Sequence, residues 1–419
     1  MKLATLYAYT SRGLVQSVSG ESGRKRLYRR SDLERLRARR DARAGHGPVA
    51  AAALRFGEPV LDSSITSINP DRGPSYRGRE ALALAEDSVA FESVAEILWH
   101  AGGAVEIADR RFPAWQVDDL GVPLAGACEL SPPETSPLAT LATLVPLLAS
   151  RDPGRFTDQR DSVIARSRQL IRRMAAGLGL SREPARRASS VTAALRAPSV
   201  ASAIAEALGA QGGDRGVEYL DRALVLGADH ELNASTFAAR VAASTGADVY
   251  AGVSAALACL SGPRHGGASD RVEALLLEIG EPENAVRVVH ARQRRGETID
   301  GFRHPLYRDG DPRGAALIAL ARELAPESTR VRTLLALVDA MELAHAGRPN
   351  VDAGLVALSL ALELPAGAAV GIFAIARSAG WVAHMLEQYE AGYLVRPRAR
   401  YRPGAELAPP AVWPALVRD

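Results

Sequence analysis

Apolar side chains recur at three- and four-residue spacing from about residue 84 nearly to the end of the chain. This spacing follows one face of an α-helix, which turns once in about 3.6 residues. The clearest stretches are 92–101, 137–150, 159–178 and 187–210. Glycine or proline interrupts the pattern at 152–154, 177–179 and 212–213, where helices should end. The pattern predicts a mainly α protein.

Two regions depart from this simple pattern. Residues 61–66 and 76–78 flank a polar turn and predict a short hairpin or an extended lead-in. Residues 353–376 form the longest apolar tract, which Glu363 and Pro365 interrupt. Because proline ends a helix, two buried core helices joined at Pro365 explain this tract better than a membrane span.

The composition agrees with a helical core. Of the 419 residues, 47% are apolar but only 5% are aromatic, so Ala, Leu and Val must fill the interior. A chain of this length can bury a large core and hold two or three domains. Cys128 and Cys259 have no disulfide or zinc-site spacing, so we expect no metal. No secretion signal follows Met1, and a reducing cytoplasm is the expected location.

Charge is concentrated at the start of the chain. Residues 1–43 contain 12 Lys/Arg and 4 Asp/Glu, a net charge of +8, and since the whole chain is +3 the rest is −5. A basic head on a mildly acidic body indicates a polyanionic partner for the head only. Residues 44–59, rich in alanine, read as a linker.

The basic head resembles the winged helix-turn-helix of MerR-type DNA-binding proteins. The resemblance rests on residues 5–9, on Gly13-Leu14 and on 28–33, with a capping-box pattern at Ser31 to Glu34. Such modules normally carry a helix before the recognition helix, and Met1 falls where that helix should already have ended. DNA recognition and a solvated basic helix pair therefore both remain open for residues 1–45.

The densest candidate chemistry lies in residues 301–313, where His304 stands among arginines. Asp311 and Pro312 read as the N-cap and first residue of a helix, which places Arg313 in its opening turn. Cationic side chains beside a helix N-terminus suit a small dianion. For an isolated loop, a solvated basic segment would be the better interpretation.

Complementary chemistry occurs in other turns. His230 lies between two predicted helices and could be a metal ligand, a helix cap or a donor to an anion; Ala234 stands where a zinc motif needs a second histidine. His265 lies in a glycine-flanked turn, where a ligand can approach the backbone. Asp352 opens an apolar helix and alone would read as an N-cap. Arg377 lies among apolar residues, where its charge needs a partner.

Together these segments resemble the citrate synthase family over roughly residues 56–402. The carrying blocks, in the family's order, are Ala-Asp-His-Glu-Leu-Asn at 228–233, Gly-Pro-Arg-His-Gly-Gly-Ala at 262–268, Gly-Phe-Arg-His with Asp-Pro-Arg at 301–313, Pro-Asn-Val-Asp at 349–352, Arg-Ser-Ala-Gly-Trp at 377–381 and Arg-Pro-Arg at 396–398. Any one block is weak, but six in order are specific.

The resemblance implies condensation of acetyl-CoA with oxaloacetate, followed by hydrolysis to citrate and CoA. Asp352 would be the base that removes a methyl proton, and His265 would donate a hydrogen bond to the thioester oxygen. His304 would polarise the ketone of oxaloacetate. A carboxylate can remove so weakly acidic a proton only if the enol oxygen is stabilised as its charge develops.

The resemblance also implies the binding residues. Arg313, Arg377 and Arg396 would grip the two carboxylates of oxaloacetate, with His230 as a further donor. In the family the last arginine comes from the partner subunit, which implies a homodimer with a shared active site. Arg308, Arg303 and Arg348 are the candidate contacts to CoA. No permanently bound cofactor is expected, since the acyl-CoA is a co-substrate.

The family fold is a large helical domain with a smaller one that closes over the active site. Here the large domain would comprise 46–267 and 363–419, and the small domain 268–362. Two positions depart from the family pattern, because Arg303 stands where glycine is usual and Arg264 where leucine is frequent. Two other functions remain open: a 2-methylcitrate synthase that uses propionyl-CoA, and a DNA-binding metabolite sensor built on this body.

Overall fold

A computed structural model describes residues 17–19, 26–28, 61–100, 115–307 and 309–397. The chain divides into two compact units, one of Ser63–Val395 and one of Met1–Asp62 with Arg396–Asp419. The second unit contains an antiparallel pair of strands, β1 (Ser17–Ser19) and β2 (Arg26–Tyr28). The helices predicted for the basic head lie outside the described residues, so the MerR-like interpretation gains no support.

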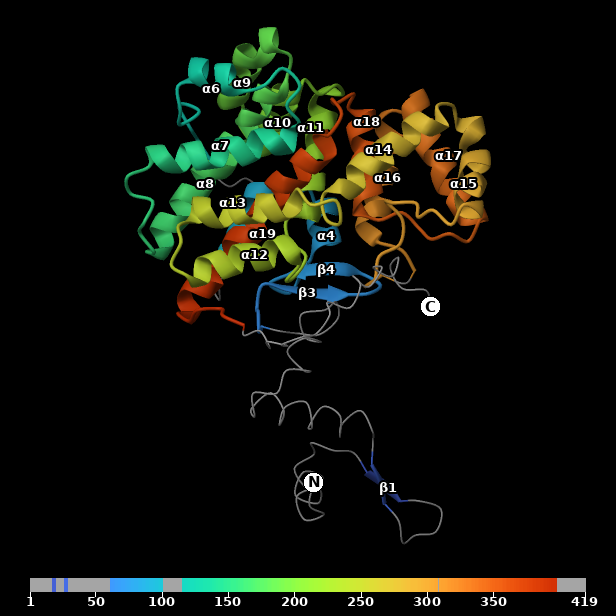
Figure 1. Cartoon of the computed structure of the whole chain (residues 1–419), viewed down its shortest axis with the longest axis horizontal. Helices are drawn as coiled ribbons and strands as arrows, with labels where there is room; N and C mark the ends of the chain where they lie inside the picture. The colour runs from blue at the N-terminus through green and yellow to red at the C-terminus, as the bar shows by residue number, and fades with distance from the viewer. Residues whose placement is uncertain (1–16, 20–25, 29–60, 101–114, 308, 398–419) are drawn as a thin grey trace, which may run out of the picture. The chain divides into compact units, whose positions relative to one another are not determined.

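The larger unit is mainly α, as predicted (Figure 1). Its helices are α4 (Ala81–Glu86), α5 (Phe91–Trp99), α6 (Leu124–Leu130), α7 (Pro137–Arg151), α8 (Arg160–Gly177), α9 (Arg187–Arg196), α10 (Val200–Leu208), α11 (Gly213–Gly227), α12 (Ala234–Ser244), α13 (Val249–Leu260), α14 (Gly267–Ile279), α15 (Ala285–Arg294), α16 (Pro312–Leu324), α17 (Thr329–Leu343), α18 (Val351–Ala361) and α19 (Ala368–Ala391). Short 3₁₀ turns cover Leu178–Ser181, Pro184–Arg186 and Pro282–Asn284.

The predicted lead-in is a small antiparallel sheet. Its strands are β3 (Thr66–Asn69), β4 (Gly73–Tyr76) and β5 (Arg79–Glu80), paired in that order. The Tyr76 ring is fully buried, and its hydroxyl donates to the carbonyl oxygen of Val225 over 2.9 Å. This bond ties the sheet to the C-terminal end of α11.

Helix α19 is the centre of this unit, where it contacts α5, α7, α8, α11, α12 and α13 (Figure 1). It is long and apolar enough to cross a membrane, but its apolar window is entirely buried within the structure. Helix α18 ends at Ala361, and α19 begins at Ala368 after Gly367, whose φ is +75°. The apolar tract is therefore two core helices joined around Pro365, as the sequence predicts.

One predicted helix was wrong in extent. The pattern at 187–210 is divided between α9 and α10, because Pro198 cannot continue a helix and Ser199 caps the next one. The Ser199 hydroxyl accepts from the backbone N–H of Ser202, and the Ser202 hydroxyl accepts from the backbone N–H of Ser199. This reciprocal cap starts α10 afresh.

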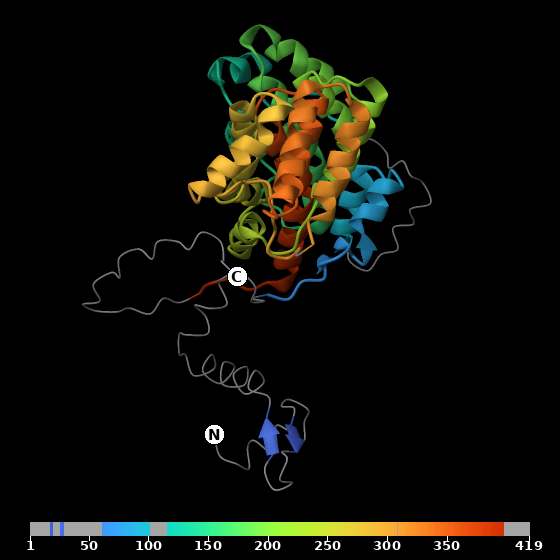
Figure 2. The same cartoon turned by 90° about the vertical axis from the view of Figure 1, so that its right-hand side faces the viewer.

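Helices α14 to α18 gather on one side of the unit and face the viewer in Figure 2. Within the group, α18 packs on α14 and α16, and α15 packs on α17. Contacts of α11 with α16 and of α18 with α19 join it to the remaining helices. These helices fall within the predicted small domain, 268–362, which remains a prediction as a separately moving body.

Candidate active site

Two loops that carry predicted catalytic residues run side by side. Phe302 and Pro349 form an antiparallel bridge. The backbone N–H of Arg303 donates to the carbonyl oxygen of Arg348 over 2.8 Å, and the N–H of Asn350 donates to that of Gly301 over 2.9 Å. This pairing holds the segment before His304 against the segment before Asp352.

The proton on His304 is set by its own loop. The backbone N–H of Leu306 donates to His304 Nδ1 over 3.2 Å, so Nδ1 acts as an acceptor. Burial and then the charge of Arg313 lower the pKa of His304 to about 4. The ring is therefore neutral at pH 7 and carries its proton on Nε2, from which it can donate.

Asp352 lies in the first turn of α18 but does not cap it. The N-cap is Asn350, whose side-chain oxygen accepts from the backbone N–H groups of Asp352 and Ala353. Asp352 Oδ1 accepts from the Ser269 hydroxyl over 3.0 Å. Burial raises the pKa of Asp352 to about 6, against the opposing effects of Ser269 and Arg313. A carboxylate with this pKa is ionised at pH 7 and more basic than an exposed one.

His265 is anchored through a serine. Its Nε2 lies 2.8 Å from the Ser235 hydroxyl, which also accepts from Trp381 Nε1 over 3.1 Å. The same hydroxyl lies 2.8 Å from Asn233 Oδ1 and can donate to either neighbour. Burial and then Arg377 lower the pKa of His265 to about 4, so this second imidazole is also neutral.

His230 lies in the connection between α11 and α12, as predicted. Its Nε2 is 2.7 Å from the Tyr307 hydroxyl, and its ring centre is 5.3 Å from that of His304. Burial and then Arg313 lower the pKa of His230 well below its usual value. Among the residues that the structure describes, no group of three potential ligands could hold a metal ion, so the metal-ligand interpretation gains no support.

Arg313 is a buried cation with a built-in partner. Its Nε and Nη2 donate to the two carboxylate oxygens of Asp311 over 3.0 Å and 2.8 Å, which leaves Nη1 for another acceptor. Burial lowers the pKa of Arg313, but Asp311 outweighs this effect and raises it overall. Asp311 also caps α16 as predicted, by accepting from the backbone N–H of Arg313.

A close helix crossing places Arg313 beside Asp352. A Cβ on Gly354 would lie 3.0 Å from the Cα of Gly314, and one on Gly314 would lie 2.3 Å from the carbonyl oxygen of Asn350. Any side chain at these glycines would push α16 and α18 apart.

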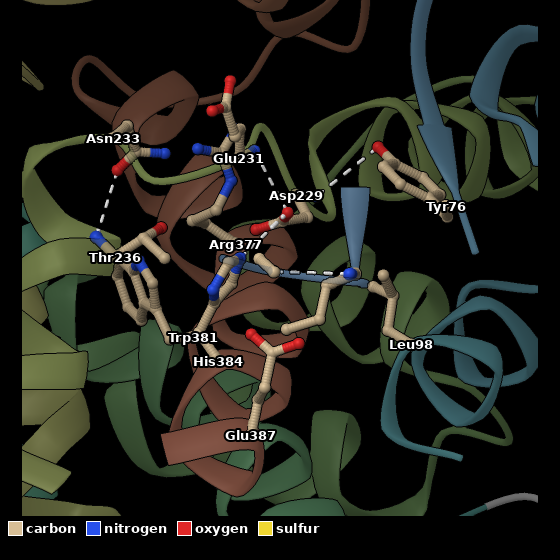
Figure 3. A network of polar contacts seen from close by, with 12 residues as sticks. Tyr76, Leu98, Asp229, Glu231, Asn233, Thr236, Arg377, Trp381, His384 and Glu387 are labelled. Carbon is tan, nitrogen blue, oxygen red and sulfur yellow. Dashed lines mark hydrogen bonds and ion pairs between the residues drawn. The ribbon is translucent and has the colours of Figure 1, made fainter. Parts of the chain in front are cut away.

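Arg377 projects from the middle of α19 and is almost fully buried. Its Nε donates to the carbonyl oxygen of Gly227 over 2.9 Å, and its guanidinium lies 4.5 Å from the Phe373 ring centre. Burial lowers the pKa of Arg377 to about 10, against the favourable charge of Asp229. Figure 3 shows Asp229 near both Arg377 and His384 of α19, and its Oδ2 is 3.4 Å from His384 Nε2.

The three predicted catalytic residues and the two buried arginines form one electrostatic cluster. Arg377 affects His265 and Arg313, while Arg313 in turn affects His304 and Asp352. The two arginines thus connect a carboxylate and two neutral imidazoles that come from three separate segments. Such a set can remove a proton and donate hydrogen bonds to two oxygens on a bound dianion.

Comparison with known proteins assigns the family. Residues 55–398 match the family model described as the C-terminal domain of citrate synthase. The chain belongs to the citrate synthase family. This family consists of condensing enzymes that transfer acyl groups, and the fold agrees with that assignment.

Individual relatives agree with the family model. Over 354 residues the chain is 32% identical to the citrate synthase of Haloferax volcanii, covering 82% of this chain and 93% of that protein. It is 28% identical to 2-methylcitrate synthase 2 of Corynebacterium glutamicum, covering 81% and 91%. A match of 42% to citrate synthase 2 of Bacillus subtilis spans only 44% of this chain and half of that protein.

A solved structure supports the fold. The chain superimposes on the citrate synthase of Thermoplasma acidophilum, determined as a ternary complex, with a TM-score of 0.71 and 25% sequence identity.

 That structure contains carboxymethyl coenzyme A and oxaloacetate, and the superposition covers 85% of this chain and 97% of the other. A likeness that extends over nearly the whole of a solved citrate synthase agrees with the helical architecture described above.

Two of the predicted CoA contacts, Arg303 and Arg348, are exposed, unlike the buried arginines Arg313 and Arg377. Arg303 is exposed, and its Nε donates to the carbonyl oxygen of Ala346 over 2.7 Å. Its φ of +66° lies in the left-handed region, where the glycine usual in the citrate synthase family would be unstrained. Arg348 is exposed and donates to the carbonyl oxygen of Asp309 over 3.3 Å. Arg308 lies outside the described residues.

Arg396 is exposed and follows α19 in an irregular segment of the other unit. Its role at an active site remains a prediction. Sequence reasoning assigned no role to the side chains that support the predicted ones: Tyr307 at His230, Ser235 at His265, Ser269 at Asp352, and the buried pair of Asp229 and His384. The sequence carries a signal for two of them, since Asp229 and Tyr307 lie within the matched blocks at 228–233 and 301–313.

Proposed function

We propose that this citrate synthase-family enzyme joins the methyl carbon of acetyl-CoA to the ketone carbon of oxaloacetate and hydrolyses the resulting thioester. The observation that carries this proposal is the connected set of Asp352, with a pKa raised to about 6, and two imidazoles with pKa values lowered to about 4. One ionised base and two neutral donors are the groups that enolisation and ketone polarisation require.

Proton removal and charge stabilisation would take place at two residues. Asp352 accepts a methyl proton, and the negative charge that develops on the thioester oxygen receives a hydrogen bond from His265. For this, the Ser235 hydroxyl would turn its proton from Asn233 Oδ1 to His265 Nε2, which would leave the ring proton on Nδ1. The N–H of Trp381 donates to the oxygen of the same hydroxyl and holds it beside His265.

The ketone and carboxylates of oxaloacetate would be held on the other side of the cluster. His304 donates from Nε2 to the ketone oxygen, which makes the adjacent carbon electrophilic. Arg313 contributes its remaining Nη1, and Arg377 and His230 contribute further donors. Guanidinium groups suit this task because they stay charged when desolvated and bind carboxylates with two hydrogen bonds.

The site would be completed by a second copy of the chain. Arg396 of the partner subunit is the third carboxylate ligand in this proposal, and a homodimer is its consequence. Its exposed position after the last helix supports a role outside its own chain's core. Closure of residues 268–362 over the substrates would exclude water before condensation and so protect the enol.

The acyl-CoA would bind at Arg308 and at the exposed arginines Arg303 and Arg348. Its acyl group could carry one more methylene, since the relatives include a 2-methylcitrate synthase. Propionyl-CoA is thus the second candidate co-substrate, because a single methylene alters pocket preference by only about 1–3 kcal/mol. A cytoplasmic location and DNA binding by residues 1–45 remain predictions that rest on the sequence alone.

The test is thiol release by the purified full chain. Oxaloacetate is mixed with acetyl-CoA or with propionyl-CoA, and each substrate is omitted in turn. Release that requires both substrates is expected, and the ratio of kcat/KM values assigns the acyl group. Absence of turnover with either acyl-CoA, while oxaloacetate still binds in a calorimeter, would reject the enzyme and favour the metabolite sensor.

A further inference from the structure

Tyr307 lies against both histidines that face oxaloacetate in the proposed function, on which this inference rests. Only 2% of Tyr307 is exposed to solvent, and its hydroxyl lies 2.7 Å from His230 Nε2. Its ring centre lies 4.8 Å from that of His304 and 5.6 Å from the guanidinium carbon of Arg313. One side chain therefore contacts three residues assigned to the dianion.

The partner of the Tyr307 hydroxyl distinguishes it from two tyrosines that bond to backbone carbonyls. Tyr76 donates to the backbone carbonyl of Val225, and Tyr389 donates to that of Ala247. Such bonds satisfy a hydroxyl next to the core and carry no chemistry. The Tyr307 hydroxyl instead bonds to an imidazole of the candidate active site.

The proton arrangement of this pair follows from the states of both groups. Burial raises the pKa of Tyr307 to about 12, so the hydroxyl keeps its proton at pH 7. Burial holds the pKa of His230 well below its usual value, so the ring is neutral and one of its nitrogens is an acceptor. We assign the Tyr307 hydroxyl as the donor to Nε2 over 2.7 Å, which leaves the ring proton on Nδ1 and selects one tautomer of His230.

We propose that Tyr307 is a positioning residue for oxaloacetate binding, which fixes the orientation and tautomer of His230 and provides the ring face on which His304 packs. Loss of the hydroxyl would leave the His230 ring free to rotate and to exchange tautomers. The dianion would then meet a donor that is correctly placed only part of the time. Acyl-CoA binding would not depend on this contact.

Tyr307→Phe tests the proposal, because it removes the hydroxyl and keeps the ring. The expected result is about a tenfold rise in the KM and Kd for oxaloacetate, the effect of about one hydrogen bond. The KM for acyl-CoA should stay unchanged. Tyr389→Phe is the matched control, since it removes a partly buried tyrosine hydroxyl bond away from the cluster, and it should leave both constants unchanged.

Nitrogen-15 NMR of the histidine rings supplies a readout that needs no turnover. In the unaltered protein, His230 should show one protonated and one unprotonated ring nitrogen, and in Tyr307→Phe both signals should move to intermediate shifts. His230→Gln combined with Tyr307→Phe should weaken oxaloacetate binding no more than the stronger single change, since the two act as a unit.

The outcomes separate this inference from the proposed function. Failure of the unaltered protein to turn over either acyl-CoA rejects the proposed function, whereas calorimetry and NMR still judge Tyr307. Unchanged oxaloacetate affinity in Tyr307→Phe would overturn the inference. A tautomer mixture at His230 in the unaltered protein would overturn it as well, even where the variant does not fold.

Discussion

Gly380 is a position where a single methyl group should impair oxaloacetate binding. It lies in α19 one turn after Arg377, and its backbone N–H donates to the carbonyl oxygen of Ala228 over 3.0 Å. A Cβ at this position would lie 2.2 Å from Asp229 Oδ1 and 2.6 Å from the Ala228 carbonyl oxygen. The segment that carries His230 is therefore pressed directly against α19.

The size of the effect follows from these distances. Real Cβ contacts essentially never fall below 3.0 Å, so Gly380→Ala must displace Asp229 or α19 by about 0.8 Å, the difference between 2.2 Å and 3.0 Å. Overpacking of this kind costs about 1–3 kcal/mol of folding stability. Misplacement by about 1 Å can cost roughly a hundredfold in rate. We expect Gly380→Ala to lower kcat/KM for oxaloacetate by about 10–100-fold.

The assay is thiol release with oxaloacetate varied at saturating acyl-CoA, together with thermal unfolding. Gly126→Ala is the matched control, because a Cβ there meets no atom within 4 Å and the residue lies within α6. It should leave activity unchanged and stability equal or slightly higher. Gly380→Ala with unaltered kcat/KM would refute the idea that α19 positions the His230 segment.

Three further changes probe the supports of the cluster. Ser269→Ala removes a hydrogen bond that lowers the pKa of Asp352, so the acidic limb of the pH profile of kcat/KM, expected near pH 6, should move to higher pH. A limb that does not move would mean that another group titrates there. Asp311→Asn leaves Arg313 as an uncompensated buried cation and should lower the free energy of unfolding in denaturant by about 3–5 kcal/mol. Glu323→Gln, at an exposed ion pair, is the control and should change it by less than about 0.5 kcal/mol, so similar losses in both variants would contradict the role of burial. Arg303→Gly relieves a positive φ but loses the hydrogen bond to Ala346, so the free energy of unfolding should change little. The KM for acyl-CoA should rise severalfold, and an unchanged KM would show that Arg303 does not contact CoA.

The sequence predicted the helical architecture because apolar spacing and proline positions act locally. Six sequence blocks in the order of the citrate synthase family also predicted one site that contains His265, His304, Asp352 and two buried arginines. It did not predict that Asn350 caps α18, since Asp352 is an equally good capping residue and only the geometry decides between them.

The supporting contacts could not be predicted, because each joins residues far apart in the chain. Tyr307 meets His230 across 77 positions, and His384 meets Asp229 across 155. No local pattern records such pairs. The sequence shows that Arg303 replaces the family's usual glycine, but only the structure shows that its φ is positive.

Asp352→Asn tests the central claim most directly, because it keeps the size and the helix position of the side chain while removing the base. The measurement is the kcat of thiol release beside the Kd for oxaloacetate from calorimetry. The account predicts that kcat falls by about 10²–10⁴-fold, the usual contribution of a general base, with the Kd for oxaloacetate unchanged. Near-normal thiol release by Asp352→Asn would contradict it.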